Sequence, residues 1–127
     1  MAKSITTFLM FEGKAKQAMD FYQSLFPNSE IQQIDYAEDG TVRLATFILN
    51  GETFMCIDSS VHHAFTFTPS ISMFVECDSI DELERLFHRL SEGGQVLMDL
   101  GEIPGSEKFG WVQDQFGVSW QLNVFNA

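Results

Sequence analysis

The stretch "TFLMFEGKAKQAMDFYQSL", residues 7–25, has a counterpart later in the chain in "SMFVECDSIDELERLFHRL", residues 72–90. Laid over one another, the two stretches place apolar side chains together, among them Tyr22 on Phe87 and Leu25 on Leu90. With one more residue of shift, "NGETFM" (residues 50–55) lies over "FGVSWQ" (residues 116–121). Two copies of roughly 60 residues indicate a duplicated supersecondary unit, because a solenoid needs three or more repeats.

Each copy is predicted to open with a strand and continue into a helix. The runs at 5–11 and 70–77 are short and rich in aromatic and β-branched residues, as strands are. Apolar residues at helical spacing follow at 15–25, where Pro27 ends the helix, and at 80–90, where Gly93 does so. Ser79 and Glu82 form a capping box at the start of the second helix.

Three strands are predicted after each helix. In the first copy they cover 29–37, 41–49 and 52–58, with a hairpin at Asn50-Gly51. In the second copy they cover 95–101, 109–114 and 119–125, with a loop through Pro104-Gly105. The order βαβββ, written twice, predicts an α+β fold in one domain of residues 1–127, with modules at about 4–58 and 70–125 and a connector at about 59–69.

Charge and composition exclude several classes of partner. The chain has 18 acidic and 7 basic residues and a formal charge of −11, so it repels nucleic acid and anionic membrane surfaces. No apolar run reaches the roughly 20 residues of a membrane span, and no signal segment is visible, which predicts a cytoplasmic protein. Cys56 and Cys77 lie in apolar strand-like runs and are expected to be free and buried.

The segments "AMDFYQSLFPNS" (18–29), "NGETFM" (50–55) and "GWVQDQFGVSWQL" (110–122) carry a resemblance to a known group. In this order they resemble the vicinal oxygen chelate superfamily, also called glyoxalase/bleomycin-resistance-like. The nearest likeness is to the PhnB-like branch, whose domain also bears the label 3-demethylubiquinone 3-methyltransferase. The resemblance implies two βαβββ modules that place their sheets edge to edge as a cupped half-barrel, with the helices outside and a cavity between the modules. It also implies a homodimer.

The resemblance further implies four metal-ligand positions, which fall on Thr7, Met55, Ser72 and Gln121. Metal-using relatives have His, Glu or Gln there. Hydroxyl groups are weak neutral ligands, and a thioether suits soft copper rather than zinc, nickel or magnesium. We therefore expect no metal and no other cofactor.

Strand alternation extends the predicted ligand pocket from these four positions, because side chains at i and i+2 share a face. The expected lining is apolar with a few polar groups, as in small-molecule sites: Thr7, Leu9, Phe11, Met55, Ile57, Ser72, Phe74, Glu76, Gln121 and Asn123. The opposite face is expected under the helices and comprises Phe8, Met10, Phe54, Cys56, Met73, Val75, Trp120 and Leu122. An equally open alternative is that Gln121 and Asn123 only satisfy each other and the backbone.

Other polar residues give weaker signals. His62 and His63 are adjacent and point oppositely on an extended chain, so they are expected to be surface loop residues or a rim of the pocket. His88 is placed on a helix exterior, and the charges in "DLGEIPGSEK" (99–108) are read as solvated loop residues. No catalytic residue is assigned, since no nucleophile and base can be paired from spacing.

The sequence thus favours a protein that binds a small, largely apolar or aromatic molecule without a metal. Two alternatives stay open. One is a metal-dependent lyase, isomerase or dioxygenase of the glyoxalase type, with ligands such as His62 or His63, Glu76 and Gln121. The other is a non-catalytic interaction or scaffold protein. The methyltransferase label gains no support, because no strand is followed by the Gly-rich turn of a nucleotide site.

Overall fold

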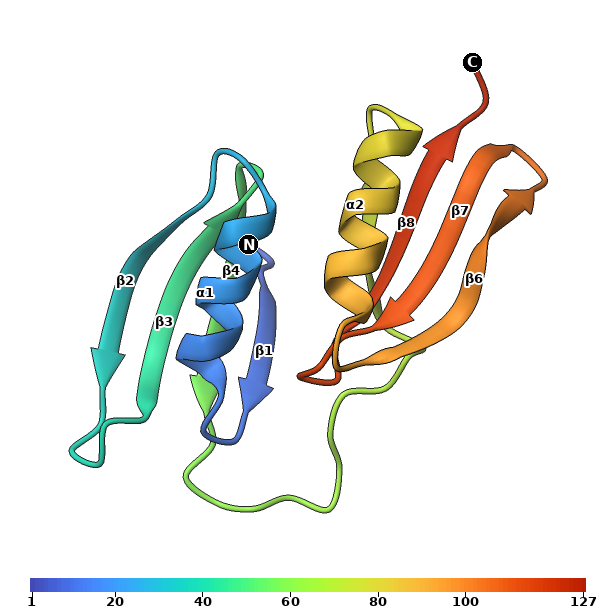
Figure 1. Cartoon of the computed structure of the whole chain (residues 1–127). Coiled ribbons are helices and arrows are strands. Elements are labelled where there is room, and N and C mark those ends of the chain that lie inside the picture. Colours follow the sequence, from blue (N-terminus) through green and yellow to red (C-terminus); the bar gives the residue numbers. More distant parts are fainter. The chain divides into compact units, whose positions relative to one another are not determined.

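The computed structural model describes residues 1–127, and these divide into two compact units, Met1–His63 and Ala64–Ala127. Each unit is a four-stranded mixed sheet with one helix (Figure 1). The predicted order βαβββ is therefore present twice, and the α+β class is confirmed. No helix is both long and apolar enough to cross a membrane.

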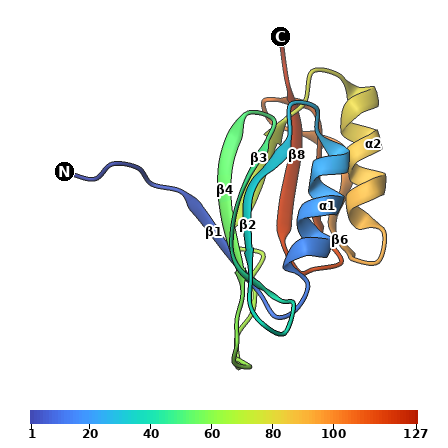
Figure 2. The same cartoon turned by 90° about the vertical axis from the view of Figure 1, so that its left-hand side faces the viewer.

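The first unit contains β1 (Thr7–Phe11), α1 (Ala15–Leu25), β2 (Glu30–Tyr36), β3 (Val42–Leu49) and β4 (Glu52–Asp58). Its strands lie in the order β1-β4-β3-β2, and only the β1–β4 pair is parallel. Figure 2 shows α1 along one side of this sheet. The helix buries the apolar stripe that its spacing predicts: Ala15, Ala18, Met19, Tyr22 and Leu25.

The second unit repeats this plan with β5 (Ser72–Glu76), α2 (Ile80–Ser91), β6 (Gln95–Ile103), β7 (Ser106–Gln113) and β8 (Ser119–Phe125), in the order β5-β8-β7-β6. α2 buries Leu83, Leu86, Phe87 and Leu90. At Gly110 of β7 the packing is so close that an added Cβ would lie 2.8 Å from the ring of Phe87. A glycine is thus required where helix and sheet meet.

The predicted loop through Pro104-Gly105 is shorter than expected. Strands β6 and β7 continue to either side of Pro104-Gly105, so the segment is a tight hairpin rather than a long connection. Asp99, Glu102 and Glu107 belong to these strands, although all three are exposed as expected. Proline and glycine correctly indicate a turn. The acidic residues on both sides of it are more typical of loops than of strands, so the sequence does not indicate how far the two strands extend.

The two helices begin in different ways. Ser79 accepts a hydrogen bond from the Glu82 backbone N–H at 3.1 Å, which caps α2 as the sequence predicts. α1 has no such cap from its own chain segment. Instead the buried Asp58, at the end of β4, accepts from Gly13 N at 2.8 Å and Ala15 N at 3.0 Å through one carboxylate oxygen. Its other oxygen accepts from Val42 N at 2.9 Å.

The sheet face opposite the helix of the same unit is called the open face below. In the second unit the predicted alternation holds, because Met73 pairs with Trp120 and Phe74 with Gln121. The pairing places Ser72, Phe74, Glu76, Gln121 and Asn123 on the open face. Their neighbours Met73, Val75, Trp120 and Leu122 lie on the helix-covered face.

In β1 the predicted face is wrong. Leu9 pairs with the fully buried Cys56, and Leu9 and Phe11 are only 7% and 4% exposed. Thr7, Leu9 and Phe11 therefore lie on the helix-covered face, whereas Phe8 and Met10 share the open face with Met55 and Ile57. A one-residue slip causes the error, since it moves every side chain of a strand to the other face.

Candidate functional site

A hydrogen-bonded group of polar side chains lies on the open face of the second sheet, and we call it the Ser72–Gln121 network. Ser72 Oγ and Ser119 Oγ are 2.7 Å apart, and each also lies 3.2 Å from the carbonyl oxygen of Pro69. The Trp111 indole N–H donates to Ser119 Oγ at 2.8 Å. The Gln121 amide Nε2 donates to Ser72 Oγ at 3.1 Å.

The orientation of the Gln121 amide follows from the number of protons. The two serine hydroxyl groups supply two protons, of which one serves the Pro69 carbonyl and the other the bond between the hydroxyls. Neither proton is left for Gln121, so its side chain has to donate to Ser72. The amide oxygen of Gln121 is consequently directed away from the network, as a free acceptor on a half-buried residue.

Aromatic and apolar side chains surround this network. Phe74, directly opposite Gln121 on β5, is 53% exposed, and its ring centroid lies 6.0 Å from that of Phe125, which is 50% exposed. Met98 of β6 pairs with Trp111 and is also exposed. Large apolar side chains next to a few fixed polar groups are the usual composition of a small-molecule site.

Asn123 lies on the same face but is only 1% exposed. Its side-chain oxygen accepts from Ser106 Oγ at 2.5 Å, and its Nδ2 is buried without a partner. Gln121 and Asn123 therefore do not bond to each other, and that part of the alternative reading is wrong. The Asn123 amide serves the interior of the unit rather than its surface.

The open face of the first sheet is apolar along β1 and the end of β4. Phe8 is 52% exposed, and Met10, Met55 and Ile57 are half-buried beside it. Thr46, which pairs with Met55, is the neighbouring polar side chain on β3. These residues offer contact area but no imidazole or carboxylate.

His62 and His63 lie just beyond β4 and contact Glu12, which follows β1. His62 Nδ1 is 2.8 Å from Glu12 Oε1, and the His63 backbone N–H donates to Glu12 Oε2 at 3.4 Å. The hydrogen bond with His62 is the main cause that lowers the pKa of Glu12. His63 Nε2 in turn lies 2.9 Å from Ser59 Oγ. The contacts of His62 and His63 thus hold the chain after β4 against the end of β1. His88, a separate case, is exposed on α2 as expected.

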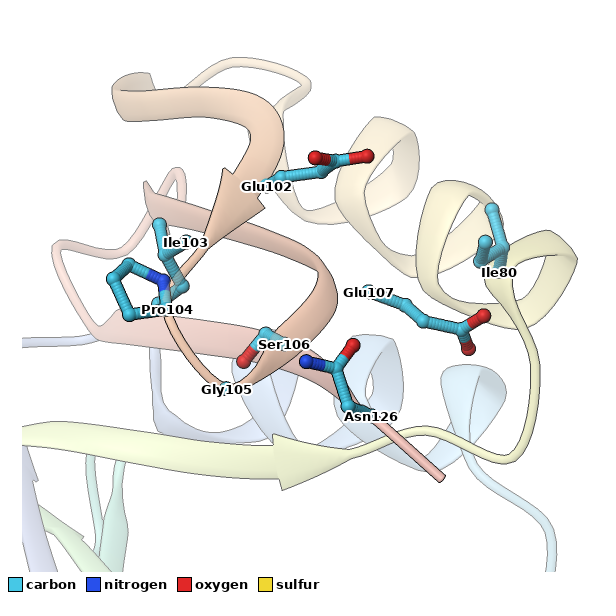
Figure 3. Close-up of a pocket in the computed structure, with 8 residues that line it drawn as sticks. All are labelled: Ile80, Glu102, Ile103, Pro104, Gly105, Ser106, Glu107 and Asn126. Carbon is cyan, nitrogen blue, oxygen red and sulfur yellow. The ribbon is translucent and has the colours of Figure 1, made fainter.

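A pocket of about 600 Å³ that sequence reasoning did not foresee lies at the β6–β7 hairpin. Its lining is Ile80, Glu102, Ile103, Pro104, Gly105, Ser106, Glu107 and Asn126. In Figure 3 the Glu107 side chain extends toward Ile80, the first residue of α2. The two carboxylates make the pocket acidic, and the hydroxyl of its buried Ser106 is already donated to Asn123.

The residues at the positions of the superfamily's metal ligands do not fit a divalent ion. On the second sheet they are a hydroxyl and a carboxamide that already bond to each other. On the first sheet Met55 lies beside Phe8, and Thr7 faces the helix. No group of three or more His, Cys, Asp or Glu side chains is arranged to hold a metal. We derive no chemistry through a metal ion for this reason.

Comparisons with known proteins find the same fold in other chains. The PhnB protein from Bacillus cereus is 54% identical over 96% of this chain and 99% of its own, with a TM-score of 0.93. Protein PA1353 from Pseudomonas aeruginosa is 27% identical over 99% and 100% of the two chains, with a TM-score of 0.81. FosX from Listeria monocytogenes, in complex with Mn(II) and 1S,2S-dihydroxypropylphosphonic acid, is 13% identical over 99% and 95%, with a TM-score of 0.66.

Two βαβββ units, each a mixed sheet with one covering helix, define the glyoxalase-like fold, which this chain shares with all three proteins. At 54% identity to the Bacillus cereus protein, this is a PhnB-like chain. It belongs to the family described as 3-demethylubiquinone-9 3-methyltransferase, whose model matches residues 3–123.

Proposed function

We propose that the protein binds a small, largely apolar or aromatic molecule without a metal ion, on the open face of the second sheet. The observation that carries the proposal is the Ser72–Gln121 network among exposed aromatic side chains. A folded domain ordinarily covers such rings, and their exposure beside a fixed amide marks a binding surface. The site residues are Ser72, Phe74, Glu76, Trp111, Ser119 and Gln121.

Methyl transfer is not part of this proposal. A nucleotide-type donor is usually held by free backbone N–H groups at a helix start. Here Asp58 occupies those groups at α1, and Ser79 caps α2. Neither helix start can therefore hold a nucleotide-type methyl donor, and the structure of these two sites gives no support for the methyltransferase activity in the family's name.

The test is a nuclear magnetic resonance titration of the whole chain with 2-naphthamide, a neutral aromatic probe. We expect shifts to concentrate on β5, β7 and β8, with the Trp111 indole N–H among the most affected signals. Phe74→Ala should weaken binding about 5-fold or more, because it removes a ring from the contact surface. Phe8→Ala, an equally exposed ring of the first unit, is the matched control. Saturable shifts confined to the acidic pocket or to the first unit would refute the proposal.

A further inference from the structure

Around Phe74, the polar atoms that the open face of the second sheet leaves free are chiefly acceptors. The indole N–H of Trp111 and both serine hydroxyl protons are used within the network. One hydrogen of the Gln121 amide is used as well. What faces outward is the Gln121 carbonyl oxygen and, on the same face, the exposed carboxylate of Glu76. A ligand that satisfies these atoms has to donate hydrogen bonds.

The charge on this face has one sign. The four strands contain a single basic residue, Lys108, which pairs with Val124 on the helix-covered face and lies 3.3 Å from Glu84 of α2. No cation therefore balances Glu76 on the open side. An anionic ligand would be repelled by the Glu76 carboxylate and would have no basic side chain to pair with. A cationic ligand could form an ion pair with Glu76.

The spacing of the residues fits a compact ligand. Phe74 and Glu76 are two residues apart on β5, about 6.6 Å along a strand and on the same face. Gln121 lies directly across from Phe74. A ring placed on Phe74 would thus hold a short substituent within reach of both the Gln121 oxygen and the Glu76 carboxylate.

Resting on the proposed function, we infer that the ligand class is a small aromatic ammonium, with its ring on Phe74 and its N–H groups donated to Gln121 and Glu76. The same arrangement discriminates against aromatic carboxylates. An ion pair at an exposed position changes affinity by a factor of about 5 at most. Because Glu76 attracts the ammonium and repels the carboxylate, the dissociation constants of the two ligands should differ roughly 10-fold.

Three probes of one shape test this inference: 2-naphthylmethylammonium, 2-naphthamide and 2-naphthoate. Each is titrated into the whole protein at neutral pH, with dissociation constants taken from the β5 and β8 signals. We expect the ammonium to bind most tightly and the carboxylate roughly 10-fold more weakly. Glu76→Gln should bring the two within about 2-fold, and Glu76→Lys should reverse their order. Because Glu76 is exposed, both variants should keep the fold, which their spectra report directly.

Glu107→Gln is the matched control, since it removes an exposed carboxylate that lines the acidic pocket instead. It should leave the preference unchanged. The inference is overturned if naphthoate binds as tightly as the ammonium, if the preference survives Glu76→Gln, or if Glu107→Gln abolishes it. If none of the three probes shifts the open-face signals, the proposed function itself fails, and that result is distinct from an inverted order.

Discussion

At the scale of single residues, two buried carboxylates organise the chain turns of their units. Asp58 accepts three backbone N–H bonds at the start of α1 and of β3. Asp114 accepts from Phe116 N, Val118 N and the Trp120 indole in the turn before β8. Asp58 does not stand out in the sequence, because its partners lie up to 45 positions away. Only the fold shows what such a residue does.

Replacing Asp58 by Ala should lower the free energy of unfolding by about 2–4 kcal/mol, because three buried donors lose their acceptor at once. Asp58→Asn keeps one acceptor oxygen and should cost less. Urea unfolding measures both changes. Asp20→Ala on the surface of α1, which removes only the exposed pair with Lys16, should cost below about 0.5 kcal/mol. Equal losses for Asp58→Ala and Asp20→Ala would contradict the capping role.

The two thiols should be unreactive in the folded protein. Burial raises the pKa of Cys56 to about 12 and that of Cys77 to about 11. Since the thiolate is the reactive form, its fraction at pH 8 is roughly one in a thousand or less. Mass spectrometry after iodoacetamide at pH 8 should find neither thiol alkylated, while urea should expose both. Rapid alkylation of Cys56 without denaturant would show that β4 opens readily.

At the scale of elements, periodicity located both helices but could not fix the face of β1. The run "TFLMF" is apolar on both sides, so it shows no alternation from which a face can be read. The prediction equates Thr7 with Ser72, which is the shift of 65 that aligns the helices, and this shift does not hold for the strand. Phe8 pairs with Met55 and Phe74 with Gln121, so the strands correspond at a shift of 66. The sequence predicts two members of the Ser72–Gln121 network, Ser72 and Gln121. It does not predict Trp111 and Ser119, because only the pairing of the strands brings them to this place.

The helix–sheet contact at Gly110 predicts a sharp difference between two glycines. Gly110→Ala should lower the free energy of unfolding by about 1–3 kcal/mol, because the new methyl group meets the Phe87 ring. Gly101→Ala on the neighbouring β6 has no atom nearer than 4.0 Å to the added Cβ and should be close to neutral. Thermal unfolding of the two variants distinguishes them. Similar melting temperatures would mean that α2 adjusts its packing without cost.

The pairing of β5, β7 and β8 predicts that a metal site can be built where none is expected. Ser72→His, Trp111→His and Gln121→Glu place two imidazoles and a carboxylate side by side on one face, a donor set that suits zinc or nickel. Calorimetry should detect binding by the triple variant and far weaker binding by Ser72→His alone. A folded triple variant that binds neither ion would show that the three side chains do not converge.

At the scale of the whole molecule, exposed apolar side chains outside the proposed ligand site bear on assembly. Phe8 of the first unit is 52% exposed beside the half-buried Met10, Met55 and Ile57, and an apolar patch of this kind is typical of a protein–protein contact. We propose a homodimer, as the superfamily resemblance implies, with an isologous interface. Light scattering at micromolar concentration should give twice the 14.4 kDa chain mass. A monomer mass that persists on concentration would reject the dimer.

The origin of the two helix caps also sets an order of events during folding. α2 finds its cap three positions away, so it can begin as soon as its own segment exists. The cap of α1 is 43 positions downstream of Ala15, and it arrives only when β4 has returned to lie beside β1. On a growing chain α1 therefore leaves the ribosome with an open amino-terminal turn. Although α1 is synthesised before α2, its amino-terminal N–H groups gain their acceptor, Asp58, only after β4 has been synthesised.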